Sequence, residues 1–209
     1  MKRTRGQYIT HALCLMPLIY LAADYYLTGM TANPIQAATL LTGRTALNLI
    51  LLTLACSPIK EIFHLSAMIP IRKTLGLYAF FYAALHFLIF AGLDFEFNFQ
   101  WIIEEIRFKP FIQVGLSALL LLIPLAVSSI NFLRKKIGKY WGHLHKTIYL
   151  ISILIIIHYL QASKGDIGIP IIYAAVFIFL MLLRLPPLNK LTIKRTPDWL
   201  KRFNQFLNK

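Results

Sequence analysis

Residues 74–93 read TLGLYAFFYAALHFLIFAGL, an uncharged stretch that is long enough to cross a lipid bilayer as a helix. A membrane-spanning helix needs about 20 predominantly apolar residues. Much of the 209-residue chain is similar, since 58% of the residues are hydrophobic and only 14% are charged. One soluble core could not bury so much apolar surface. The sequence therefore predicts an all-α integral membrane protein.

Working outward from this stretch, we predict a bundle of six transmembrane helices, over residues 8–27, 34–57, 74–93, 111–132, 142–162 and 169–185. The second is the least regular because Arg44 and Asn48 interrupt it. Asn33 followed by Pro34 is nevertheless a typical helix start. We assign residues 1–186 to this domain, and we find no internal repeat in the chain.

Charge predicts the orientation of these helices. The 22 Lys and Arg residues far outnumber the 8 Asp and Glu residues. With both termini in the cytoplasm, the outer side would hold only the basic residues Arg44, Arg107, Lys109 and Lys164. Inner loops of membrane proteins carry the excess of Lys and Arg. We therefore predict cytoplasmic termini, and we interpret the net charge as a sign of orientation rather than of nucleic-acid binding.

Two segments lie outside the predicted spans. Residues 94–109 mix aromatic and acidic residues, which favours a short helix at the outer membrane surface. Residues 187–209 form a basic cytoplasmic tail in which Trp199, Leu200, Phe203 and Leu207 share one helical stripe. That pattern predicts an amphipathic helix against the lipid of an anionic inner leaflet. The tail is too short for a nucleotide-binding domain, so we expect another protein to handle any soluble redox substrate.

Two histidines lie deep in predicted spans. His86 lies roughly 20 Å above the inner start of its helix, and His158 roughly 24 Å above that of its own, at about 1.5 Å per residue. Two imidazoles at the same level can be the axial ligands of one haem. Ala79 and Ala83 share the helical face of His86 and leave room for a flat macrocycle. Alternatively, each histidine is a buried residue hydrogen-bonded to a neighbouring helix.

The remaining histidines are shallower. His145 precedes His158 by 13 residues, a spacing similar to that of helices that hold two stacked haems. At about 100° per residue the two side chains would point about 140° apart. Both can therefore line one cavity only if the helix is wound differently between them. We interpret His11, His64 and His143 as interfacial or loop residues. The two cysteines form no CxxC or CxxCH motif, which disfavours a zinc site and covalently attached haem.

Two arginines are candidates for anion binding. Arg44 could bind a haem propionate in the outer half of the membrane, or its side chain could extend to the outer surface. At the inner edge, Arg72, Lys73, Trp141 and His145 could hold a flavin phosphate or a quinone. A solvated basic loop is the simpler alternative there.

Several motifs together resemble the MsrQ family of haem-binding membrane subunits. These are TGRTAL (42–47), LTLACSP (52–58), IRKTLGL (71–77), ALH (84–86), W-x-x-L-H-x-x-x-Y-L (141–150) and HYL (158–160). The resemblance covers nearly the whole chain. It implies the ferric-reductase-like transmembrane fold, b-type haem, FMN in some members, and a location in the bacterial inner membrane. It also implies electron transfer from the quinone pool or a cytosolic flavin reductase to MsrP, a periplasmic molybdopterin enzyme that reduces methionine sulfoxide.

The same resemblance places the family's histidines at His86, His145 and His158. In the related two-haem oxidases another histidine stands where this chain has Arg72, so the number of haems stays open. We also considered a stand-alone quinol or metal reductase. The motif Gly115-Leu116-Ser117-Ala118 suggests a rhomboid-like protease as well, but such an enzyme needs a histidine in its last helix, and residues 169–185 contain none.

Overall fold

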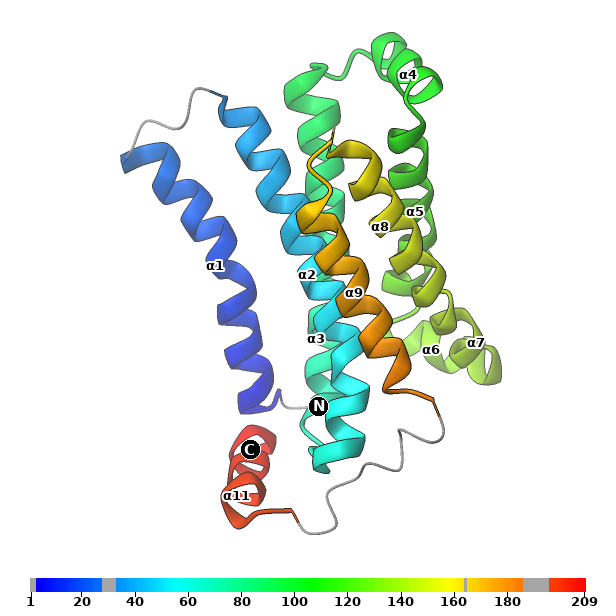
Figure 1. The fold of residues 1–209 in the computed structure, drawn as a ribbon. Coiled ribbons are helices and arrows are strands. Elements are labelled where there is room, and N and C mark those ends of the chain that lie inside the picture. The colour runs from blue at the N-terminus through cyan, green and yellow to red at the C-terminus, as the bar shows by residue number, and fades with distance from the viewer. Residues whose placement is uncertain (1–2, 28–32, 164, 186–195) are drawn as a thin grey trace.

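The computed structural model describes residues 3–27, 33–163, 165–185 and 196–209, and all regular structure in these ranges is helical (Figure 1). The elements are α1 (Arg5–Leu27), α2 (Pro34–Phe63), α3 (Met68–Ile89), the π-helical turn η1 (Phe90–Asp94), α4 (Phe99–Phe108), α5 (Pro110–Val127), α6 (Asn131–Ile137), the 3-10 turn η2 (Gly138–Tyr140), α7 (Trp141–Lys146), α8 (Ile148–Ala162), α9 (Gly168–Leu182) and α11 (Asp198–Asn208).

Five helical segments of the described chain are long and apolar enough to cross a membrane. They are Arg5–Leu27, Pro34–Phe63, Met68–Asp94, Pro110–Val127 and Asn131–Ala162. The predicted sixth span corresponds to α9, an apolar helix of 15 residues. Length and composition therefore support five of the six predicted crossings and leave the sixth as a shorter helix. The predicted domain boundary at 186 and the predicted outer residue Lys164 lie outside the described residues.

Two antiparallel helix pairs make up the centre of the protein. α2 packs along α3, and α5 packs along α8, while α9 lies across the front of α2 and α1 flanks α3 (Figure 1). The core contains Leu47, Ile50, Leu54, Tyr82 and Ile151, each at most 2% exposed. The hydroxyl of Tyr82 donates to the carbonyl of Cys14 over 2.6 Å and so ties α3 to α1. These pairs carry the two deep histidines.

The start of α2 follows the predicted signal, but its end does not. The side chain of Asn33 accepts a hydrogen bond from the Gln36 amide over 3.0 Å, and Pro34 occupies the first turn. The helix then runs past the predicted end at residue 57, through Pro58, to Phe63. Apolar composition marks the part of a helix that contacts lipid, whereas the helix itself continues until a cap ends it. His64 provides that cap in the left-handed conformation, with φ 56°.

The inner ends of the fourth and fifth predicted spans are wrong. α5 stops at Val127 and α6 starts at Asn131, so residues 111–132 are not one helix. The hydroxyls of Ser128 and Ser129 donate to the Leu125 carbonyl over 3.1 Å and 2.9 Å and compete with the helical pattern. The predicted helix 142–162 is likewise divided at Thr147 into α7 and α8. The winding therefore does change between His145 and His158.

Short helices form in both segments outside the spans, at opposite ends of the bundle. α4 lies at one end, while α11 and the start of α1 lie at the other, so the two chain ends are on one side (Figure 1). The predicted stripe of α11 is divided in the structure. Leu200 and Leu207 are buried against the start of α1, whereas Trp199 and Phe203 are 69% and 47% exposed. The tail therefore docks on the protein and leaves an aromatic face uncovered.

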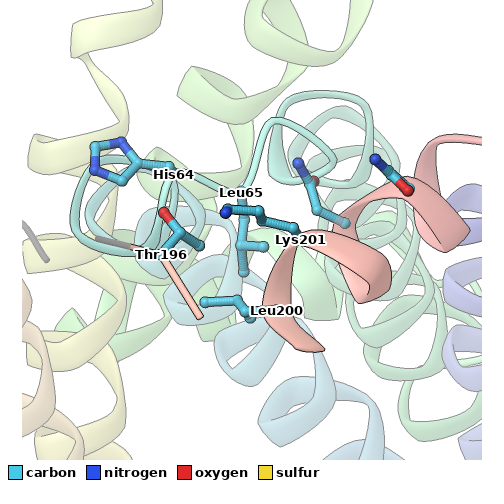
Figure 2. A pocket seen from close by; sticks show the side chains of 7 residues that line it. His64, Leu65, Thr196, Leu200 and Lys201 are labelled. Atoms are coloured by element: carbon cyan, nitrogen blue, oxygen red, sulfur yellow. The ribbon is translucent and has the colours of Figure 1, made fainter. Parts of the chain in front are cut away.

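Hydrogen bonds hold α11 to the turn between α2 and α3. The side chain of Asn204 accepts from the Ala67 amide over 3.1 Å and donates to the Ser66 hydroxyl over 3.3 Å. Asn208 also donates to Ser66. A cavity of about 260 Å³ lies beside this contact. Figure 2 shows the side chains that line it, which are those of His64, Leu65, Thr196, Leu200, Lys201, Asn204 and Gln205.

We predict that Asn204→Ala weakens the docking of α11. The change leaves the Ala67 amide without its acceptor, which costs about 1 kcal/mol and raises the undocked fraction about fivefold. Limited proteolysis of the purified protein should cut the tail faster, with unchanged helical content by circular dichroism. Gln205→Ala, at an exposed neighbouring position, is the control. Equal cleavage rates for the two variants would show that Asn204 does not hold the tail.

Candidate functional site

The structure brings His86 and His158 together between the two helix pairs. Their ring centres are 6.2 Å apart, and the ring planes are inclined by 82°. His86 comes from α3 and His158 from α8, near the ends of these helices that lie toward α4. The equal depth inferred from the sequence therefore corresponds to a direct pairing of the rings.

Each of these rings is anchored by one nitrogen. Nδ1 of His86 lies 2.9 Å from the Thr39 carbonyl, and Nδ1 of His158 lies 2.7 Å from the Phe111 carbonyl. A carbonyl oxygen can only accept, so each Nδ1 carries the hydrogen and donates it. In a neutral imidazole the other nitrogen, Nε2, then has a free lone pair. These two carbonyls could not be predicted from the sequence, because no residue type marks a backbone acceptor.

The spacing of the pair fits two axial ligands of one metal. With 6.2 Å between the ring centres, the rings are far enough apart for two metal–nitrogen bonds of about 2 Å each. Among the described residues, no group of three or more His, Cys, Asp and Glu could hold a metal ion. A metal at this pair would therefore need its other ligands from a cofactor, as the ring nitrogens of a porphyrin provide.

A polar network borders the histidine pair. Nε of Arg44 donates to the Tyr159 hydroxyl over 3.1 Å, and Tyr159 directly follows His158. The ring of Tyr159 packs edge-on against Tyr173, whose hydroxyl donates to the Asn48 side chain over 2.9 Å. Arg44 therefore has a partner inside the bundle, although its side chain remains exposed. The two tyrosines were not predicted as site residues.

A second cluster lies at the opposite end, around His145. Its ring lies 4.0 Å from the ring of Trp141, and its Nε2 is 3.1 Å from the Ser128 hydroxyl. The guanidinium carbon of Arg134 lies over the Trp141 ring, 4.5 Å from the ring centre. Arg72 donates a hydrogen bond to the Ser57 hydroxyl over 2.9 Å. The positive charges of Arg72 and Arg134 both act on the His145 ring. Of the predicted basic and aromatic residues, Arg72, Trp141 and His145 thus lie near one another with Ser128 and Arg134, whereas Lys73 donates to the Asn131 side chain over 3.3 Å.

The other predicted residues have structural surroundings. Nδ1 of His11 pairs with the Tyr78 hydroxyl over 3.0 Å between α1 and α3, and His64 caps α2. His143 is exposed. The Ser117 hydroxyl donates to the Gln113 carbonyl of its own helix over 2.8 Å, which fits a helix-packing residue rather than a nucleophile.

Comparison with known families defines the class of this protein. Residues 10–156 match the family described as "Ferric reductase like transmembrane component". The match covers more than half of the chain and places it among the ferric-reductase-like transmembrane proteins. The apolar helices and this family together indicate a multi-pass membrane protein.

Individual relatives narrow the class further. The chain is 38% identical over 185 residues to a protein of Caulobacter vibrioides, covering 88% of each chain. It is 39% identical over 173 residues to one of Herminiimonas arsenicoxydans, covering 81% of this chain and 79% of the relative. It is 36% identical over 183 residues to one of Rhodospirillum rubrum, covering 87% and 88%. All three are named protein-methionine-sulfoxide reductase heme-binding subunit MsrQ. The chain therefore belongs to the MsrQ family.

Proposed function

We propose that this protein is the membrane electron-transfer subunit of a methionine-sulfoxide reductase system. The facing pair of His86 and His158 carries the proposal, because two imidazoles with free Nε2 atoms at 6.2 Å between ring centres suit one bis-histidine haem. The names of the relatives and the ferric-reductase-like family support the same role. The substrate chemistry would then belong to a partner, an MsrP-like molybdopterin reductase.

Residues around the pair supply what a haem needs in a membrane. A haem bound here provides a one-electron carrier, and the chain's own side chains set its surroundings. His86 and His158 would hold it without a covalent link, as b-type haem. The guanidinium of Arg44 would bind a carboxylate at its edge with help from Tyr159, since a charged group inside a membrane is costly without a partner.

The cluster around His145, which we place at the cytoplasmic end of the bundle, would receive electrons. Arg72 and Arg134 attract an anion, and the His145 ring, packed against Trp141, offers a flat surface to a quinone or a flavin. FMN, a quinol or a cytosolic flavin reductase could therefore act at this end. Nε2 of His145 already contacts Ser128, so a second haem would have to displace this hydrogen bond.

Electrons would leave at the end formed by α4. We place this end in the periplasm of the bacterial inner membrane and both termini in the cytoplasm, on the basis of the positive-inside distribution. Trp101 is 57% exposed and Glu104 is exposed, so α4 presents aromatic and acidic groups to a partner. On the other side, the uncovered aromatic face of α11 would contact lipid.

We predict that His86→Ala and His158→Ala each abolish the low-spin haem spectrum, because either change breaks six-coordination. The absorbance spectrum and pyridine haemochrome content of the purified protein measure this loss. His143→Ala, at an exposed position, should leave both unchanged. Full low-spin haem in either of the first two variants would contradict the assigned ligands.

We predict that His145→Ala slows reduction of the protein by an inner-side donor at least tenfold, while dithionite still reduces it fully. The rings and guanidinium groups around His145 form the proposed entry point. Stopped-flow absorbance with a flavin reductase or a soluble quinol measures the rate, and His143→Ala is again the control. An unchanged rate with both donors would remove His145 from the path.

We predict that Glu104→Lys impairs electron delivery to the periplasmic reductase in a salt-dependent way, since exposed charges act on association rates. Glu105 is a poorer choice because it pairs with Lys109. Glu61→Lys, an exposed change at the opposite end of the bundle, should have no effect. The haem spectrum should stay unchanged in both variants. Normal turnover of Glu104→Lys at low ionic strength would exclude this surface.

A further inference from the structure

Two glycines lie directly against the paired histidines. A Cβ atom built on Gly115 would be 2.7 Å from Nδ1 of His158, and one built on Gly43 would be 3.0 Å from Nδ1 of His86. At 2.7 Å the His158 ring would have to shift, whereas at 3.0 Å the His86 ring would have to give by a few tenths of an ångström. Both glycines lie inside regular helices, where glycine costs about 1 kcal/mol relative to alanine. A packing requirement therefore explains them better than helix formation.

Helix geometry shows why the glycines stand where they do. The carbonyl of residue i accepts the regular helical bond from the amide of residue i+4. Thr39 and Gly43 have this spacing in α2, and so do Phe111 and Gly115 in α5. A side chain covers the turn on the N-terminal side of its own Cα. A side chain at i+4 would therefore cover the carbonyl that the histidine must reach.

The same arrangement occurs twice. Each histidine follows its carbonyl partner by 47 residues, and each glycine lies four residues after that carbonyl. The sequences also agree, since TGRTALNL (42–49) corresponds to VGLSALLL (114–121), and LHFL (85–88) corresponds to IHYL (157–160). The sequence alone predicted no internal repeat, whereas these matching contacts and residues indicate a short one. The repeat is short and degenerate, and only the shared contacts reveal it.

We propose that Gly43 and Gly115 are positioning residues that determine the tautomer and the ring angle of the two histidines. This inference rests on the proposed haem site. Each glycine leaves open a carbonyl that holds Nδ1–H, so the neutral ring keeps Nε2 as its free ligand atom. One ring is anchored on α2 and the other on α5, and in this arrangement the ring planes are inclined by 82°.

Anchored rings change the properties of a bound haem in two measurable ways. Perpendicular axial imidazoles leave two iron d orbitals nearly equal in energy, which gives the ferric form a strongly anisotropic low-spin EPR signal. A hydrogen bond from Nδ1–H also makes the imidazole a stronger electron donor and so favours ferric over ferrous iron. Loss of an anchor should therefore reduce the anisotropy and raise the midpoint potential.

The experiment compares the variants Gly115→Ala and Gly43→Ala in the full-length, haem-loaded protein. Gly76→Ala is the matched control, because a Cβ at Gly76 in α3 would meet only the side chain of Thr53 at 3.8 Å, an ordinary contact. EPR of the ferric form and potentiometric titration are the measurements. We expect a smaller g anisotropy and a more positive potential, larger for Gly115→Ala than for Gly43→Ala, and no change for Gly76→Ala.

The outcomes separate this inference from the proposed function. An unchanged EPR signal and potential in both variants would overturn the positioning role. Equal shifts in Gly76→Ala would also overturn it. The same holds if Gly115→Ala and Gly43→Ala both fail to accumulate as folded haem-free protein while Gly76→Ala accumulates normally. If only Gly115→Ala fails to accumulate, Gly43→Ala, with the longer contact, decides the question. A haem that survives His86→Ala and His158→Ala would instead refute the proposed site itself.

Discussion

The need to pair every polar group inside a hydrocarbon environment governs the histidine site. An imidazole N–H that is buried without an acceptor costs several kcal/mol. Within a bundle of apolar helices, the acceptors that are always present are backbone carbonyls, and each has a second lone pair beside its helical bond. His158 uses this lone pair on Phe111, and His86 shares the Thr39 carbonyl with the Thr42 hydroxyl, which donates to it over 3.1 Å. The same bonds that make the histidines tolerable in the membrane also leave Nε2 of each ring available as a ligand.

The two ends of the bundle are built for different chemistry. At the end near α4, two imidazoles face each other with only Nδ1 engaged. At the other end a single imidazole contacts Trp141 and Ser128, and Arg72 donates to the hydroxyl of Ser57. The first arrangement suits a metal between two neutral ligands. The second suits a flat, anionic molecule, because it combines ring surfaces with guanidinium groups.

Much of this fold could be predicted from the sequence, because the apolar stretches are long and the histidines lie at matched depths. Helix ends were less predictable. α2 continues past its apolar part to Phe63, and Ser128 and Thr147 interrupt helices that composition alone joins. The partners of the site were the least accessible. Backbone carbonyls leave no mark in the sequence, and Gly43 and Gly115 acquire a meaning only when the rings packed against them are known.

The two helix pairs are connected in different ways. The longer connection, between α5 and α8, carries the residues around His145. A short turn joins α2 and α3. The packing of these two helices against each other holds His86 in place. α5 and α8 are joined through α6, η2 and α7, and this connection carries Arg134, Trp141 and His145. The bonds from Trp141 and His145 to Ser128 close this connection onto the end of α5. The contacts around His145 therefore tie this connection to one end of α5, and the bond between His158 and Phe111 joins α8 to the other end.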